Sequence, residues 1–251
     1  GLPGGDRCHA RRAGAGARVT PLEKLFAGQL PRLVMFDLDG TLLDSVPDLA
    51  AAVACMLAQL GRPLAGTTKV RDWVGNGSKV LVRRALADQL EHSAVADALA
   101  DQAHQLFLQA YADCHELSSV YPGVRECLDW LQAHGVAMAL VTNKPTQFVG
   151  PLLAQTGLAE YFRWVLGGDS LPVQKPDPAA LHWVLQQASV LPQQALFVGD
   201  SRNDVQAARA AGVPCVAVSY GYNHGRPIAE ENPLLVLPDL RQLVDSTRRL
   251  G

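Results

Sequence analysis

Cysteines are few in this sequence and form no recognisable spacing. There are five, an odd number, and none stands in a C-x-x-C pair. The pattern excludes a disulfide framework and a cysteine-based zinc site, and it favours a reducing compartment, so we expect a cytoplasmic protein. Three cysteines stand in apolar periodic surroundings and are expected to be small core residues: Cys55, Cys127 and Cys215.

Excess charge and long hydrophobic runs are also missing. Lys and Arg number 22 against 24 Asp and Glu, a net charge of −2, so nothing attracts a nucleic acid or an anionic membrane electrostatically. The longest purely apolar run, residues 49–58, is too short to cross a bilayer. We therefore expect no nucleic-acid partner and no membrane insertion. We also expect no secretory signal, because no charged start precedes an apolar stretch.

The chain is long enough to bury a substantial core. Its 251 residues, 48% of them hydrophobic, fit one large domain or a core domain with a smaller insert. Residues 1–18 differ from the rest, with five Gly, four Arg and a single acid and no apolar periodicity. We expect them to form a disordered tail, or not to belong to the natural protein.

Short apolar runs alternate with helical stretches over most of the remaining chain. The runs expected to be strands cover residues 33–36, 136–141, 164–166, 195–198, 215–218 and 234–237. A last helix is expected over residues 239–250. Because nearly continuous apolar strands that alternate with helices are typical of a parallel sheet covered on both faces, we expect an α/β fold.

An all-helical block interrupts this alternation. Its expected helices cover residues 48–60, 78–90 and a stretch through 95–110 that Ser93 would cap. We therefore expect residues 19–46 and 118–251 to form the core domain and residues 47–117 an inserted cap. Hinges for cap closure are expected near residues 44–47 and 117–122.

Polar residues follow three of the expected strands, where the carboxyl ends of a parallel sheet place binding sites. With a lysine ahead of a later helix, they are Asp37 and Asp39, Thr142 and Asn143, Asp200 and Asp204, and Lys175. The first two carboxylates could simply cap a turn. Four clustered carboxylates, however, repel one another unless a hard cation binds among them. Mg²⁺ suits such oxygen ligands, and Lys175 would balance a phosphate group.

Four short motifs carry a family resemblance. The stretch from Asp37 to Thr41, then Thr142, Lys175-Pro176 and the stretch from Gly199 to Asp204 resemble the ordered motifs of the haloacid dehalogenase-like phosphohydrolases. The resemblance covers residues 33–250. It implies a Rossmann-like, doubly wound, mostly parallel sheet with an inserted all-helical cap, and Mg²⁺-dependent hydrolysis of a phosphate ester.

The resemblance also implies a role for each motif residue. Asp37 would be the nucleophile that forms an aspartyl-phosphate, and Asp39 the general acid to the leaving alkoxide and then the general base. Lys175 would neutralise Asp37 and the phosphoryl group. The Thr142 hydroxyl and the Asn143 backbone N–H would hold phosphate oxygens.

A metal site is implied in the same way. Mg²⁺ would be bound by the carboxylates of Asp37 and Asp200 and by the backbone carbonyl of Asp39. Asp204 would support the ion through a water molecule or by holding its ligands.

The substrate is implied to be a small phosphorylated acid, with 2-phosphoglycolate the first candidate. An acid at position 39 favours phosphate esters over halides, because an alkoxide needs a proton to leave. Cap residues Asn76 and Gly77, at the start of an expected helix, are predicted to bind the substrate carboxylate. Basic residues stand nearby in the cap, and their alternative role is a solvated surface: Arg71, Lys79, Arg83 and Arg84.

Three alternatives stay open from the sequence. The enzyme could be a phosphatase for another small sugar phosphate, such as an amino-sugar 6-phosphate, or a mutase of the same superfamily. A third alternative is a non-catalytic binding module on the same scaffold, although the residues needed for catalysis are all present. The sequence predicts a monomer or a homodimer without deciding between them.

Overall fold

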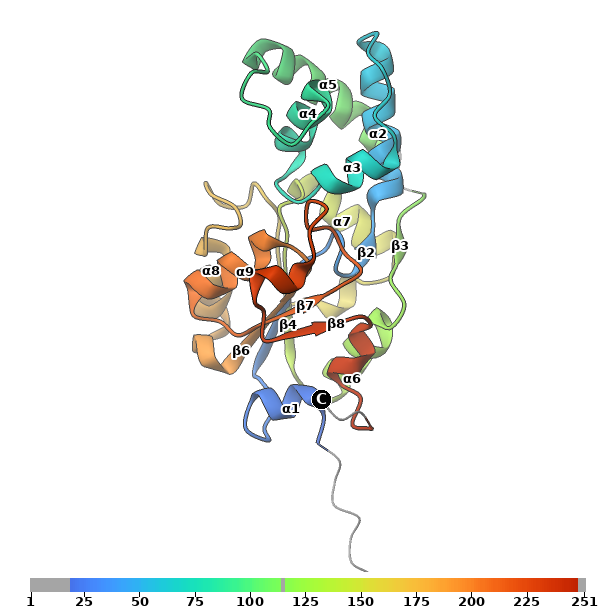
Figure 1. The fold of residues 1–251 in the computed structure, drawn as a ribbon. Coiled ribbons are helices and arrows are strands. Elements are labelled where there is room, and N and C mark those ends of the chain that lie inside the picture. Colours follow the sequence, from blue (N-terminus) through green and yellow to red (C-terminus); the bar gives the residue numbers. More distant parts are fainter. Residues whose placement is uncertain (1–18, 114–115, 248–251) are drawn as a thin grey trace, which may run out of the picture.

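The central strand β1 (Leu33–Phe36) is apolar along its length and buried on both sides. It pairs in parallel with β4 (Ala137–Val141) on one side and with β6 (Ala195–Gly199) on the other. Further parallel pairs extend the sheet to β5 (Trp164–Leu166) beyond β4, and to β7 (Cys215–Val218) and β8 (Leu235–Leu237) beyond β6. The strand order β5-β4-β1-β6-β7-β8 confirms the predicted parallel α/β sheet (Figure 1).

This structure is a computed structural model that describes residues 19–113 and 116–247. The predicted tail, residues 1–18, lies outside the described part. The chain runs from β1 to β4 and β5 on one side, and then returns to β6 on the other side of β1. This reversal beside β1 is the position at which open parallel sheets bind their ligands.

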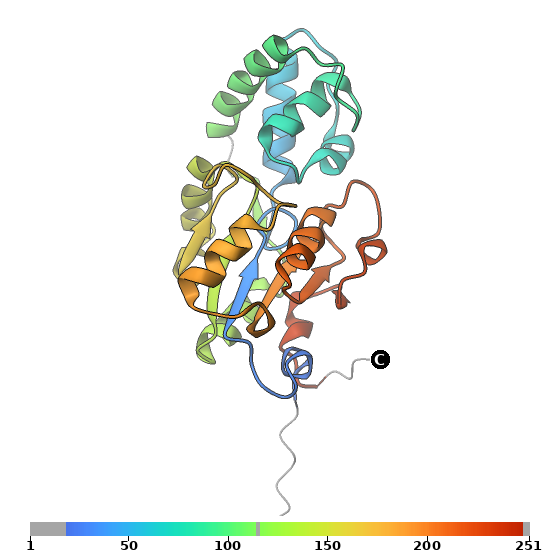
Figure 2. The same ribbon diagram turned by 90° about the vertical axis from the view of Figure 1, so that its left-hand side faces the viewer.

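Helices cover both faces of the sheet. One face carries α6 (Val124–Ala133) and α7 (Thr146–Gln155), and the other carries α8 (Ala179–Ala188) and α9 (Arg202–Ala211). Residues of β1 alternate between the two layers: Val34 and Phe36 join the first cluster, Leu33 and Met35 the second. Figure 2 shows α8 and α9, in orange, lying across the sheet.

The remaining elements of the core are short. They are helix α1 (Pro21–Leu25) and the 3₁₀ turns η1 (Ala159–Tyr161), η2 (Pro192–Gln194), η3 (Ile228–Glu231) and η4 (Leu240–Leu243). Helix α1 starts with a capping box, in which Thr20 and Glu23 satisfy each other's backbone N–H groups. No helix within the described ranges is long and apolar enough to span a membrane.

Four helices form a separate layer above the sheet (Figure 1). They are α2 (Val46–Gln59), α3 (Thr67–Trp73), α4 (Ser78–Ala87) and α5 (Asp97–Ala112). Their own hydrophobic cluster includes Val53 and Met56 of α2 and Phe107 of α5. The helical insert predicted from the sequence is thus present, and it lies between β1 and β4 along the chain.

Two connections join this cap to the core, and they lie side by side. They pair as β2 (Leu43–Asp44) and β3 (Ser119–Val120), an antiparallel ladder of two residues each. The buried carboxylate of Asp48 accepts hydrogen bonds from the backbone N–H groups of Leu117 and Ser118, at 3.0 and 2.7 Å. This ladder stands where hinges were predicted.

Several local predictions were wrong. Helix α5 begins at Asp97 with Ala96 as its N-cap, and Ser93 instead lies in a turn with its N–H bonded to Glu91. The sequence pattern also missed α3, because its seven residues include only two buried ones, Val70 and Trp73. Such a short helix has too few turns to show a helical period.

The predicted C-terminal helix is also wrong over its described part. Residues 240–243 form the 3₁₀ turn η4, and no helix continues through residue 247. The Asp245 side chain accepts the backbone N–H of Thr247, a local bond that competes with helix formation. Cys55 is exposed rather than buried, because it points away from the apolar face of α2, whereas Cys127 and Cys215 are buried as predicted.

We expect Leu140→Ala in β4 to destabilise the fold by about 2–5 kcal/mol, because it opens a cavity among residues with no exposed surface. The matched control is Leu234→Ala, where the same side chain is 57% exposed, and its effect should stay within about 0.5 kcal/mol. Urea unfolding measures both. Equal effects of the two variants would contradict the assigned core.

Candidate active site

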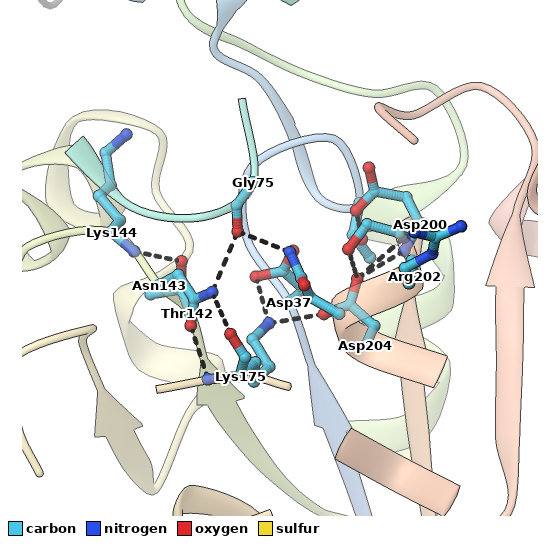
Figure 3. A network of polar contacts seen from close by, with 12 residues as sticks. Asp37, Gly75, Thr142, Asn143, Lys144, Lys175, Asp200, Arg202 and Asp204 are labelled. Atoms are coloured by element: carbon cyan, nitrogen blue, oxygen red, sulfur yellow. Dashed lines mark hydrogen bonds and ion pairs between the residues drawn. The ribbon is translucent and has the colours of Figure 1, made fainter. Parts of the chain in front are cut away.

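The carboxylates predicted from the first and last motifs meet at the carboxyl ends of β1 and β6. Asp37, Asp200 and Asp204 are all buried, and each offers a carboxylate oxygen within 4.8 Å of the others. Figure 3 shows them converging from the end of β1 and the start of α9. The parallel pairing of β1 with β6 places Phe36 opposite Val198, so the residues after both strands are neighbours.

A single lysine lies between two of these carboxylates. The Lys175 amine is 2.9 Å from Oδ1 of Asp37 and 2.7 Å from Oδ1 of Asp204, and its side chain is 2% exposed. Burial works to lower the pKa of Lys175, but the adjacent carboxylates of Asp204 and Asp37 outweigh it and hold this pKa above its usual value. Lys175 is therefore a fixed positive charge in the site.

One lysine does not balance three carboxylates. Burial, and then the negative charge of Asp204, raises the pKa of Asp37 from 3.8 to about 7, although Lys175 opposes the rise. Burial and the charges of Asp204 and Asp37 raise the pKa of Asp200 as well. Carboxylate oxygens that are crowded and dry in this way suit a hard divalent cation, which would relieve the repulsion.

The two outer carboxylates differ in how they are held. Oδ1 of Asp204 accepts the Lys175 amine, and Oδ2 accepts the backbone N–H groups of Asp200 and Ser201, both at 3.0 Å. Among the described residues, Asp200 accepts one hydrogen bond on each oxygen, from the Thr41 hydroxyl and from the Tyr222 backbone N–H. Both oxygens of Asp204 are thus occupied by hydrogen bonds that hold neighbouring groups, whereas the oxygens of Asp200 have more capacity to bind a cation.

Close approach of the loops around Asp200 requires glycine. A Cβ on Gly40, whose φ is +87°, would lie 2.2 Å from Oδ2 of Asp200, and one on Gly221 would lie 2.4 Å from the same oxygen. Any side chain at either position would displace the carboxylate.

Asp39 has partners that differ from those of Asp37. Its Oδ1 accepts the Ser45 hydroxyl at 2.5 Å and the Lys144 amine at 2.9 Å. The Lys144 side chain is 2% exposed and also lies over the ring of Tyr111, with Nζ 4.8 Å from the ring centroid. Sequence reasoning gave Lys144 no role. The sequence did contain a signal for this residue. Lys144 follows Thr142 and Asn143 at the end of a buried strand, so it stands at the same edge of the sheet as these two predicted site residues.

Thr142 and Asn143 stand at the end of β4, as predicted, and both line the cavity beside Asp37 and Asp39. The Asn143 side chain has a further position that the sequence did not indicate. Its amide donates to the backbone carbonyls of Lys175 and Gly75, at 2.9 and 3.0 Å. Asn143 therefore connects the phosphate-side loops to the cap (Figure 3).

The cap reaches the core through the carbonyl of Gly75. Besides Asn143, the Asn203 amide donates to this oxygen at 3.1 Å. The Asn76 amide is turned onto Oδ1 of Asn203 at 3.3 Å, and Asn76 is not among the residues that line the cavity. Gly77 does line it. Of the two predicted cap contacts to substrate, Gly77 faces the cavity and Asn76 faces the core loop.

The cavity between cap and core has a volume of about 40 Å³. Its floor is formed by the catalytic-motif residues and its walls by apolar side chains of the cap and of α7: Leu49, Val74, Leu81, Phe107, Tyr111 and Phe148. Because one water needs about 10–15 Å³ of such space, the cavity in this structure has room for about three waters.

Comparison with known proteins agrees with this arrangement. The family described as haloacid dehalogenase-like hydrolase matches residues 34–218, which include the cap, every motif named above and all of the sheet except Leu33 and β8. The chain belongs to the haloacid dehalogenase-like hydrolases. The buried cluster of Asp37, Asp200 and Asp204 is typical of the metal site of this family.

Individual members of this hydrolase family are similar over most of their length. The phosphoglycolate phosphatase of Pseudomonas savastanoi pv. phaseolicola is 67% identical over 226 residues, which cover 90% of this chain and 83% of that protein. Phosphoglycolate phosphatase 1 of Pseudomonas aeruginosa is 63% identical over the same shares. The crystal structure of a predicted phosphoglycolate phosphatase from Haemophilus somnus has a TM-score of 0.80 at 38% identity, covering 86% of this chain and 98% of that one.

We expect the stability of the metal-free protein to fall as pH rises from about 4 to about 7. Between the unfolded pKa of Asp37, 3.8, and its folded pKa of about 7, the folded state holds a proton that the unfolded state lacks, so raising the pH favours unfolding. Thermal unfolding in EDTA measures this slope, and Asp37→Asn, which cannot titrate there, should flatten it. Added Mg²⁺ should raise the Tm most at the upper end of this range. A wild-type slope equal to that of Asp37→Asn would contradict the charge assignment.

We expect Asn203→Asp to loosen the cap. The aspartate keeps the size of the side chain but cannot donate to the Gly75 carbonyl, and one lost hydrogen bond of about 1 kcal/mol corresponds to roughly a fivefold change in a local opening equilibrium. Hydrogen exchange over residues 67–87 should speed up by about that factor, while exchange in α8 serves as the internal control. Unchanged exchange in α3 and α4 would show that this contact does not hold the cap.

Proposed function

We propose that this chain is a phosphatase that hydrolyses 2-phosphoglycolate to glycolate and phosphate. Two observations together support the proposal. Relatives 63–67% identical over nine-tenths of the chain bear this name. Asp37 and Asp39 line a cavity between cap and core, and Asp37 also contacts Lys175 and lies in one cluster with Asp200.

Asp37 is the proposed nucleophile. It lies at the cavity floor with one oxygen against Lys175, so its other oxygen is available to attack phosphorus. Attack forms an aspartyl-phosphate and breaks the bond between phosphorus and the leaving oxygen, which divides one hard displacement into two easier ones. The Lys175 amine and the Thr142 hydroxyl, with the Asn143 backbone N–H, hold the negative phosphoryl oxygens.

Asp39 is the proposed general acid and base. It stands two residues after Asp37, at the same cavity, and is positioned by the Ser45 hydroxyl and the Lys144 amine. It donates its proton to the departing glycolate oxygen. It then takes a proton from the water that attacks the aspartyl-phosphate, so the proton balance closes over the two steps.

Mg²⁺ is the proposed ion at the carboxylate cluster. When bound by Asp37 and Asp200 and by the backbone carbonyl of Asp39, it would offset the charge of the carboxylates and of the phosphate. The saturated hydrogen bonding of Asp204 favours a supporting position for that residue. The proposal includes a cytoplasmic location and a monomer or homodimer, which stay predictions.

The alternatives weighed from the sequence receive less support. The name that the similar proteins share, phosphoglycolate phosphatase, disfavours the sugar phosphatase and the mutase. A non-catalytic module is disfavoured by the retention of Asp37, Asp39, Lys175 and Asp200 in one connected site.

We expect wild-type protein to release phosphate from 2-phosphoglycolate in preference to glucose 6-phosphate and glucosamine 6-phosphate, and to lose this activity in EDTA. Asp37→Asn should lower the rate on the order of 1000-fold or more, because no aspartyl-phosphate can form. Asp37→Ala checks that deamidation does not restore activity, and Asp101→Asn, an exposed aspartate of the cap, is the matched control.

Each outcome of this panel has a definite meaning. Preference for a sugar phosphate would keep the chemistry and overturn the substrate. Full activity of Asp37→Asn would overturn the nucleophile. No turnover of any substrate by the wild type would support the binding module instead.

A further inference from the structure

The cavity has one positive charge on the side where the leaving group departs. Among the described residues that line it, Lys144 alone carries a cationic side chain, and the cap contributes mostly apolar walls. The side chains of Lys144 and Lys175 extend in different directions in Figure 3, and only the Lys175 amine is joined to Asp37. The two lysines therefore serve different parts of the bound substrate.

The basic residues of the cap are committed elsewhere. Arg71, Arg83 and Arg84 each donate to backbone carbonyls, and none of them lines the cavity. Their carbonyl partners belong to Tyr220 for Arg71, Val95 for Arg83 and Trp73 for Arg84. Lys79 is exposed on α4, outside the cavity. Within the described ranges, the cap therefore supplies no charge for an anionic leaving group.

The buried Lys144 amine is held by contacts at the cavity. Its amine lies 2.9 Å and 3.3 Å from the two oxygens of Asp39 and over the face of the Tyr111 ring, with almost no exposure to solvent. A buried ammonium ion needs an anionic partner, since an unpaired buried charge is strongly disfavoured. Asp39 fills that place in this structure, and Asp39 is also the residue that must reach the leaving oxygen.

The proposed reaction sets the distance from that oxygen to the rest of the substrate. If Asp39 protonates the leaving oxygen, that oxygen lies beside Asp39, and in 2-phosphoglycolate a single methylene separates it from the carboxyl carbon. The carboxylate consequently falls within reach of whatever groups already contact Asp39. The Ser45 hydroxyl and the Lys144 amine are those groups, and of the two only Lys144 carries a charge and lines the cavity.

We propose that Lys144 binds the carboxylate of the substrate and so determines the specificity for a phosphorylated acid, an inference that rests on the function proposed above. The incoming carboxylate takes over the amine and frees Asp39 for the leaving oxygen. A phosphate ester without a carboxylate leaves Lys144 on Asp39. Gly77 and Ser78, at the start of α4, line the same cavity as Lys144. The substrate carboxylate predicted to bind at the start of this helix would therefore occupy the same cavity.

The test compares two substrates that differ only in the group at the end of the leaving alcohol. Ethyl phosphate carries a methyl group where 2-phosphoglycolate carries its carboxylate, so the ratio of their kcat/KM values isolates recognition of that charge. Lys144→Met keeps most of the length of the side chain and removes the charge. We expect the ratio to fall on the order of 100-fold in this variant, with activity reduced on both substrates because Asp39 loses its partner.

Two further variants sharpen the comparison. Lys144→Arg keeps a positive charge and should keep part of the preference, whereas Lys79→Met, on the exposed face of α4, should keep all of it. Thermal unfolding checks that each variant is folded. Binding of 3-phosphonopropionate and of propylphosphonate, inert analogues with and without the carboxylate, gives the same ratio by calorimetry without any turnover.

The outcomes separate the two proposals. If the wild type shows no preference for 2-phosphoglycolate over ethyl phosphate, the proposed function itself fails. If the wild type shows the preference and Lys144→Met loses activity equally on both substrates, Lys144 only positions Asp39 and the inference is overturned. If the ratio collapses in both kinetics and binding, Lys144 recognises the carboxylate.

Discussion

The contact between the Lys175 amine and the carboxylates of Asp37 and Asp204 is the interaction on which the site depends. Three buried carboxylates within 4.8 Å of one another repel strongly, and a single lysine offsets only part of this repulsion. The remaining imbalance makes the cluster a cation site. It also explains the surrounding loops, since backbone N–H groups and glycines crowd around Asp200 and Asp204 where side chains would leave the charges unsupported.

The cap completes this site without adding charge to it. It closes over the motif residues with apolar side chains, while the Gly75 carbonyl receives two asparagine amides from the core. Because these apolar side chains exclude water, the electrostatic interactions beneath them are stronger, and the charges of the core act on a substrate with little screening. Asn143 belongs to both parts, because it also holds the backbone of Lys175. The contact between cap and core and the placement of Lys175 are thereby connected.

Local patterns predicted most of the core and little of the cap's detail. The strands β1, β5 and β7 were predicted at their observed bounds, since each is a short apolar run between polar residues. Errors arose where local bonds or short length defeat periodicity. Helix α3 is too short to show a period, and the C-terminal turn is held by the Asp245 side chain.

The sequence by itself determined which carboxylates meet, because a parallel sheet brings the ends of its strands to one edge wherever they stand in the chain. Asp37 and Asp200 could be assigned to one cluster for this reason, whereas Lys175, ahead of a helix, was assigned by the family resemblance. Only the tertiary structure decided which positive charge lines the cavity. Arg71, Arg83 and Arg84 of the cap bind backbone carbonyls outside it, and Lys144 lies inside it. Packing across two separate connections sets how cap and core meet, and no local pattern encodes that contact.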